Sequence, residues 1–71
     1  MTLAQAELGK PYEILSIETE DEELDDFLFT LGCYSGENIT VVSTVGDSFV
    51  VSIRDGRYNI GRDLAEAIRV S

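Results

Sequence analysis

Apolar residues recur with a helical period near the middle of the chain. Four of them follow the i, i+3, i+4, i+7 spacing that places side chains on one face of a helix: Leu24, Phe27, Leu28 and Leu31. Thr19 and Glu22 have the spacing of a capping box, and Gly32 supplies a residue able to stop the helix in the left-handed conformation. The pattern predicts an amphipathic helix over about residues 20–31, with this apolar face buried in the core.

After Gly36 the apolar residues alternate with polar ones, which is typical of β-strands. Three strands are predicted, with the sequences ITVVSTV over residues 39–45, SFVVSIR over 48–54 and RYNI over 57–60. A two-residue turn at Gly46-Asp47 would divide the valines between both faces, whereas an odd-length loop of Gly46-Asp47-Ser48 would leave one clean apolar face. We therefore expect the odd loop and an inner face made of Ile39, Val41, Val45, Phe49, Val51 and Ile53.

The rest of the pattern completes a small barrel. Asp55-Gly56 has the composition of a two-residue hairpin turn, which would form the inner-face pairs Ile53 with Tyr58 and Val51 with Ile60. Upstream, YEILSIE offers Leu15 and Ile17 as inward residues of a first strand, and downstream DLAEAIRV predicts one helical turn and a short closing strand. The expected fold is mostly β with one inserted helix, a small five-stranded barrel whose closure would protect the strand edges.

Length and composition narrow the possibilities further. The 71 residues allow one domain over residues 1–71, and one cysteine with no histidine excludes an intramolecular disulfide and leaves at most one ligand for a Cys/His zinc site. The first residues, MTLAQAELGKPYE, lack the basic and apolar regions of a signal peptide, and no stretch approaches the length of a membrane span. We expect a cytoplasmic, soluble protein.

The net charge of −9 is concentrated in the first third of the chain. Residues 1–26 hold nine acids and one lysine, a net charge of −8, whereas residues 27–71 hold five acids and four arginines, a net charge of −1. Nucleic-acid binding draws its affinity from Lys and Arg contacts to phosphates, and anionic membranes attract basic segments. The charge therefore argues against a nucleic-acid or direct membrane partner.

Candidate chemistry is sparse. Cys33 has no histidine to activate it and follows the negative end of a helix, so a small hydrophobe with an inert thiol is the favoured interpretation over a nucleophile. The acidic run over residues 18–26 could attract hard cations, with Glu22, Asp25 and Asp26 as weak metal candidates, but it lacks the glycine turn of a calcium loop and is better explained as a solvated helix face. No catalytic residue and no cofactor are predicted.

Three residues beside the predicted turns are candidates for contact with a partner. Arg54 and Arg57 would lie opposite each other on the sheet surface. An acidic partner would stabilise this like-charge pair, although solvated arginines are the simpler interpretation. Tyr34 lies in the short connection between Gly32 and Gly36, where it could present an aromatic face. With Cys33 beside Tyr34, the predicted partner-binding set is Cys33, Tyr34, Arg54 and Arg57.

The order of these features resembles the ferrous iron transport protein A (FeoA) family. The matching features are a first strand, a helix ending LxxLG, a GxxIxVV segment, two hairpins and a final LAxxIxV, here carried by Leu28, Leu31, Gly32, Gly36, Ile39, Val41, Val42, Val51, Ile53, Ile60, Leu64, Ala65, Ile68 and Val70. The family commonly has a large apolar residue at Cys33, a proline at Ser35 and often basic residues at Asp25 and Asp26, so this chain departs from it there.

The resemblance implies an SH3-like barrel that acts as a noncatalytic cytoplasmic accessory of the ferrous iron transporter, whose cytosolic part carries a G-protein domain. The same module is also found at the C-terminus of iron-dependent repressors. Either role would be carried out by protein contact. The alternative is a protein that binds iron(II) directly, or acts as an iron chaperone, through the acidic helix.

Overall fold

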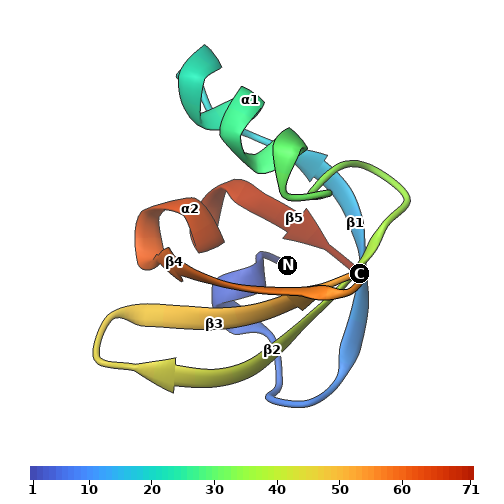
Figure 1. Cartoon of the computed structure of the whole chain (residues 1–71), viewed down its shortest axis with the longest axis vertical. Coiled ribbons are helices and arrows are strands. Elements are labelled where there is room, and N and C mark those ends of the chain that lie inside the picture. The colour runs from blue at the N-terminus through green and yellow to red at the C-terminus, as the bar shows by residue number, and fades with distance from the viewer.

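A five-stranded antiparallel sheet forms the body of the protein. The structure is a computed structural model that describes all residues, 1–71. The elements in chain order are a 3-10 turn η1 (Leu3–Gln5), β1 (Pro11–Ile17), α1 (Glu22–Thr30), β2 (Asn38–Val45), β3 (Ser48–Ile53), β4 (Gly56–Gly61), α2 (Arg62–Ala67) and β5 (Ile68–Val70). The strand order is β4-β3-β2-β1-β5, so the sheet ends on β4 and β5 and is not closed by hydrogen bonds (Figure 1). The mostly β architecture with a helix inserted after the first strand is confirmed.

The core draws its side chains from every strand and both helices. Fourteen buried residues, all hydrophobic, form one cluster: Leu3, Tyr12, Ile14, Leu28, Cys33, Ile39, Val41, Phe49, Val51, Ile53, Ile60, Ala65, Ile68 and Val70. In β3 the predicted alternation is confirmed, because Phe49, Val51 and Ile53 are buried and the residues between them are not. No polar side chain is buried, so hydrophobic burial is the main source of the fold's stability.

The predicted loop between β2 and β3 is wrong. Val45 pairs with Ser48 across a two-residue Gly46-Asp47 turn, in which Gly46 takes a φ of +59°. The register then shifts between Val41 and Ser43, and this bulge returns the apolar residues to one face. Val45, predicted to point inward, is 63% exposed as a result.

The predicted turn between β3 and β4 is also displaced. The pairing of Ile53 with Gly56 makes Arg54 and Asp55 the turn residues instead of Asp55 and Gly56. Val51 therefore pairs with Tyr58 and Phe49 with Ile60, and Arg57 lies opposite Ser52, not opposite Arg54. The turn moves by one residue, so each β3 residue pairs with a β4 residue two positions earlier than predicted; because two is an even number, the inner face keeps the predicted residues.

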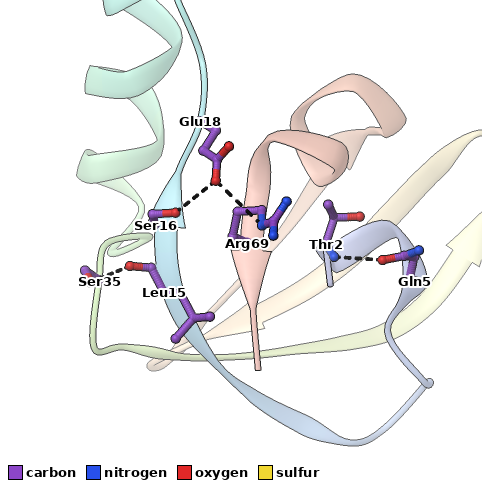
Figure 2. Close-up of polar contacts among 7 residues, drawn as sticks. All are labelled: Thr2, Gln5, Leu15, Ser16, Glu18, Ser35 and Arg69. Atoms are coloured by element: carbon purple, nitrogen blue, oxygen red, sulfur yellow. Dashed lines mark hydrogen bonds and ion pairs between the residues drawn. The ribbon is translucent and has the colours of Figure 1, made fainter.

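β1 buries a different alternation from the predicted one. Tyr12 and Ile14 are buried, Leu15 is 49% exposed, and Ile17 packs against the core as expected. Leu15 faces outward because it follows the inward-facing Ile14, and the register irregularity against β5 between Ile14 and Ser16 returns Ile17 to the core side. Figure 2 shows the polar contacts here: Ser35 Oγ donates to the Leu15 carbonyl at 2.8 Å, and Glu18 meets Arg69 at 3.6 Å.

The inserted helix α1 is shorter and far more exposed than predicted. Its N-cap is Asp21, whose carboxylate accepts from the Glu23 amide at 2.9 Å, and the predicted Thr19–Glu22 capping box does not form. Of the predicted apolar face, Leu28 is buried and Leu31 packs against the core, whereas Leu24 is 37% and Phe27 48% exposed. Figure 1 shows the reason, because the first turns of α1 extend beyond the sheet.

The C-terminal elements match the prediction. The short helix α2 connects β4 to β5, and Ala65, Ile68 and Val70 enter the core. β5 pairs with β1, and Thr2 forms a bridge to Arg69 on its other side, so this edge is partly covered. Neither α-helix has the length and apolar character needed to cross a membrane.

Candidate functional site

A cleft separates the end of α1 from the β3–β4 turn. Its volume is about 490 Å³. Residues of the helix end and the loop after it form one wall, and residues of the turn form the other: Phe29, Thr30, Leu31, Gly32 and Tyr34 face Ile53, Arg54, Asp55, Gly56 and Tyr58. Two segments some twenty residues apart in the sequence thus meet at one surface.

Gly32 allows these two walls to approach each other. It ends α1 with a φ of +92°, which confirms the predicted left-handed stop. A Cβ at this position would lie 3.4 Å from Arg54 Cδ and 3.4 Å from Ile53 Cγ2. Gly32 is therefore fixed both by its backbone angle and by the aliphatic stem of Arg54.

Arg54 is the best-fixed charged side chain of the cleft. Its backbone has a φ of +55°, and it is the only residue other than glycine with a positive φ. Its guanidinium donates to Tyr34 Oη at 2.7 Å and to Glu37 Oε1 at 3.2 Å, and lies 5.6 Å from the centre of the Tyr34 ring. The hydrogen bond to Glu37 raises the pKa of Arg54, so the cation is permanent. Non-glycine residues in this conformation concentrate at functional sites, which makes Arg54 a candidate contact residue.

Tyr34 and Phe29 form the aromatic part of the cleft. Their ring centres are 5.1 Å apart with a tilt of 38° between the planes. Tyr34 is half-buried, whereas Phe29 is 64% exposed, the most exposed large hydrophobic residue of the chain. An exposed aromatic supported by a second aromatic and a cation is typical of a residue that inserts into a partner.

The predicted set divides when it is placed on the structure. Tyr34 and Arg54 are in direct contact in the cleft, as their candidacy for one surface requires. Cys33 is 1% exposed in the core, so its side chain does not reach the surface that its place in the predicted partner-binding set requires. Burial raises the pKa of its thiol to about 11, which agrees with the interpretation of Cys33 as a small hydrophobe. Arg57 is exposed on β4 opposite Ser52 and does not line the cleft.

The acidic candidates do not converge. Glu22, Asp25 and Asp26 are all exposed on α1. Nowhere in residues 1–71 do three or more His, Cys, Asp or Glu side chains come together in a group that could hold a metal ion. The geometry thus gives no ligand set to the alternative of direct iron(II) binding by this helix.

Sequence reasoning missed two residues that line the cleft, Phe29 and Tyr58, and one residue outside it, Glu37, that orients Arg54. Glu37 fixes Arg54, Phe29 covers Tyr34, and the Tyr58 ring lies over the Cα of Gly56, where a Cβ would collide with it. Phe29 carried a signal, since a large aromatic directly after Leu28 falls outside the apolar helical face. The role of Glu37 depended on the displaced turn and left no mark in the sequence pattern.

The comparisons with known proteins agree on one family. A protein-family model for the FeoA domain matches residues 1–71. No curated protein matches the chain. Among solved structures, FeoA from Stenotrophomonas maltophilia, complexed with zinc and described as a procaryotic SH3 domain protein, is 22% identical with a TM-score of 0.88, over 100% of this chain and 89% of that chain.

Two further structures place the same module in longer chains. Iron(II) transport protein A from Clostridium thermocellum is 29% identical with a TM-score of 0.91, over 100% of this chain and 44% of that chain. IdeR from T. acidophilum is 25% identical with a TM-score of 0.88, over 100% of this chain and 33% of that chain. The predicted SH3-like fold and the predicted resemblance are confirmed, and the chain belongs to the FeoA domain family.

Proposed function

We propose that this chain is a noncatalytic accessory protein for ferrous iron uptake, which acts in the cytoplasm by contact with the cytosolic G-protein region of the ferrous iron transporter. Membership of the FeoA domain family supports the transport role, and the S. maltophilia relative has been put forward as a bacterial ferrous iron transport activating factor. Contact is the mode of action that the side chains of the cleft favour.

The observation that carries the proposal is the exposed Phe29 beside the fixed Arg54. Burying an aromatic side chain removes about 150 to 250 Å² from water. Tryptophan, tyrosine and arginine dominate binding energies at interfaces, where phenylalanine is also enriched. Arg54 is already oriented by Tyr34 and Glu37, so little side-chain entropy is lost when a partner binds it. The cleft thus supplies an apolar anchor and an oriented cation within one surface.

The proposal is tested by calorimetric titration of the chain into the purified cytosolic region of the transporter from the same organism, with and without guanine nucleotide. We expect saturable binding in at least one nucleotide state. Phe29→Asp should weaken the affinity about tenfold or more, because it places a charge in an apolar contact.

A matched control comes from the last residue of β2, beside the β2–β3 turn. Val45 is 63% exposed, close to the 64% of Phe29, but lies beside the Gly46-Asp47 turn, far along the hairpin from the cleft. Val45→Asp should leave the affinity within about twofold of the unaltered chain. Absence of saturable binding in every nucleotide state, or equal loss in both variants, would contradict the proposal.

A further inference from the structure

The first turns of α1 carry an apolar surface that no other element covers. Leu28 and Leu31 use the C-terminal half of the helical face to reach the core. Leu24 and Phe27 continue that face towards the N-terminus of α1 and are 37% and 48% exposed. The first turns of α1 extend beyond the sheet (Figure 1). We call Leu24 and Phe27, with the acids around them, the overhang.

The overhang is surrounded by negative charge without compensating cations. Glu20, Glu22, Glu23, Asp25 and Asp26 are all exposed, and none belongs to the three ion pairs of the molecule, which join Arg54 to Glu37, Arg62 to Glu66 and Arg69 to Glu18. The chain has no lysine or arginine between Lys10 and Arg54. Asp21 is committed to capping the helix through the Glu23 amide.

This charge is greater than the helix itself needs. Acids in the first turn interact favourably with the helix N-terminus, but Asp25 and Asp26 lie three and four residues after Glu22, the spacing at which like charges on a helix repel. Beside them, Leu24 and Phe27 remain partly exposed to water. A ligand with apolar side chains surrounded by positive charge would both reduce the repulsion between the acids and bury the exposed apolar area.

We propose that the overhang binds a basic amphipathic segment of the partner, in which lysine or arginine residues flank a short apolar stripe. α1 has nine residues and is therefore about 14 Å long, which matches two to three turns of a partner helix. This inference rests on the proposed function, since it gives the chemistry of the partner segment and a second surface beyond the cleft.

Charge selects this occupant over two others. A second copy of the chain packed helix to helix would place two uncompensated acidic surfaces against each other. An anionic membrane surface would be repelled in the same way. A basic segment is attracted over a distance of about 10 Å at moderate salt, so its binding must weaken as salt increases.

The first experiment uses synthetic helical peptides of about 14 residues, measured by fluorescence anisotropy. One peptide places leucine and lysine with a helical period, a second has the same composition in scrambled order, and a third replaces lysine by glutamate. We expect the periodic lysine peptide to bind at least about tenfold tighter than the scrambled one, and to lose about tenfold between about 50 and 300 mM salt. Equal affinity for the periodic and scrambled peptides, or salt-strengthened self-association of the chain, would overturn the inference.

Two variants locate the binding on the chain. L24S combined with F27S removes the apolar stripe and leaves every charge, and the set E22Q, E23Q, D25N and D26N removes the charge and leaves the stripe. Each set of substitutions should lower the affinity of the chain for the periodic lysine peptide about tenfold or more. The control neutralises four exposed acids elsewhere, E7Q, E13Q, D47N and D63N, which form no side-chain hydrogen bond or ion pair, and should change affinity less than about threefold. Equal loss in the control would overturn the inference, because it would show attraction to net charge alone.

The same variants separate this inference from the proposed function. Titrated into the cytosolic region of the transporter, L24S with F27S should weaken binding about tenfold. If that region binds the unaltered chain and this variant equally well, the overhang inference is wrong while the proposed function stands. If the cytosolic region does not bind at all but the periodic lysine peptide binds through the overhang, the proposed function is wrong. The inference that the overhang binds basic amphipathic segments then still stands.

Discussion

The β2–β3–β4 meander and the helix α1 both carry regular apolar patterns, but only the meander buries its pattern. Phe49, Val51 and Ile53 of β3 are at most 7% exposed, because strands on both sides and the core below enclose them. In α1, Leu28 alone is buried within the helix, and Leu24, Phe27 and Phe29 face water. The period of a pattern predicts the type of element and its apolar face, but not whether another element covers that face.

The largest effect should come from a charge placed in the meander. Val51→Asp puts an unpaired carboxylate at a position that is 0% exposed, and we expect loss of the cooperative folded state, a cost of about 3 kcal/mol or more. Val41→Asp and Leu28→Asp should act alike. Phe27→Asp, on the more exposed half of α1, should cost no more than about 1.5 kcal/mol, because the side chain is only about half buried. Urea denaturation followed by circular dichroism measures both, and a normal transition in Val51→Asp would contradict the register of β3.

The boundary between the buried and exposed halves of α1 can be measured within one helix. Leu28→Ala should cost about 2 to 4 kcal/mol, because it removes a side chain that is 1% exposed and leaves a cavity. Leu24→Ala, one turn earlier, should cost less than about 1 kcal/mol, since the side chain is already 37% exposed and alanine is a good helix former. Equal costs in thermal denaturation would show that the first turns of α1 pack as tightly as the last.

Burial of Cys33 should make stability depend on alkaline pH. Burial raises the pKa of the Cys33 thiol to about 11, whereas the pKa of a thiol in the unfolded chain is about 8.5. Between these two pH values the folded state therefore keeps a proton that the unfolded state releases. The contribution of the buried thiol to the free energy of unfolding is complete below about pH 8.5 and is lost as the pH rises through about 11. The loss should be about 3 kcal/mol once the pH exceeds the folded-state pKa. Urea denaturation of the unaltered chain and of Cys33→Ala at several pH values measures it, and identical pH dependence in the two would contradict burial of the thiol.

The smallest of these effects concerns the turn between α1 and the loop. Gly32→Ala should cost about 1 to 2 kcal/mol, because alanine at a φ of +92° is strained and its Cβ would press on Arg54 and Ile53. Gly61→Ala is the comparison variant, since Gly61 has no positive φ and open space around its Cα. Gly61 is also the N-cap of α2, where alanine is less favourable than glycine, so this variant should cost less than about 1 kcal/mol. Thermal denaturation distinguishes them, and a neutral Gly32→Ala would show that the walls of the cleft do not depend on this glycine.

Much of the fold was predictable because it depends on the spacing of apolar and turn residues along the chain. The apolar alternation of β3, the helix stop at Gly32 and the short helix before β5 all follow from spacing along the chain. Both hairpin turns were predicted wrongly, yet the inner face remained correct except at Val45, since a bulge after Val41 and an even shift of the β3–β4 pairing each conserve the face. Bulges depend on how neighbouring strands twist, which a single strand's sequence does not contain.

The site was predicted only in part for a related reason. Tyr34 and Arg54 were both chosen as exposed polar or aromatic residues beside turns, and the structure brings them to 2.7 Å. The roles of Glu37 and Phe29 at the site depend on tertiary contacts, which residue spacing along the chain does not predict. The exposure of Leu24 and Phe27 was missed because helical periodicity assumes a covering partner, which this chain does not provide for the first turns of α1.

The central claim is that the exposed features of α1 and the cleft are contact surfaces, and nuclear magnetic resonance mapping tests it most directly. The backbone amide spectrum of the isotope-labelled chain is followed while the unlabelled cytosolic region of the transporter is added. We predict that shifts and line broadening concentrate on α1 and on the amides of Tyr34 and Arg54, while those beside the Gly46-Asp47 turn stay unchanged. Perturbation centred on that turn, or a spectrum unchanged at saturating partner, would contradict the account.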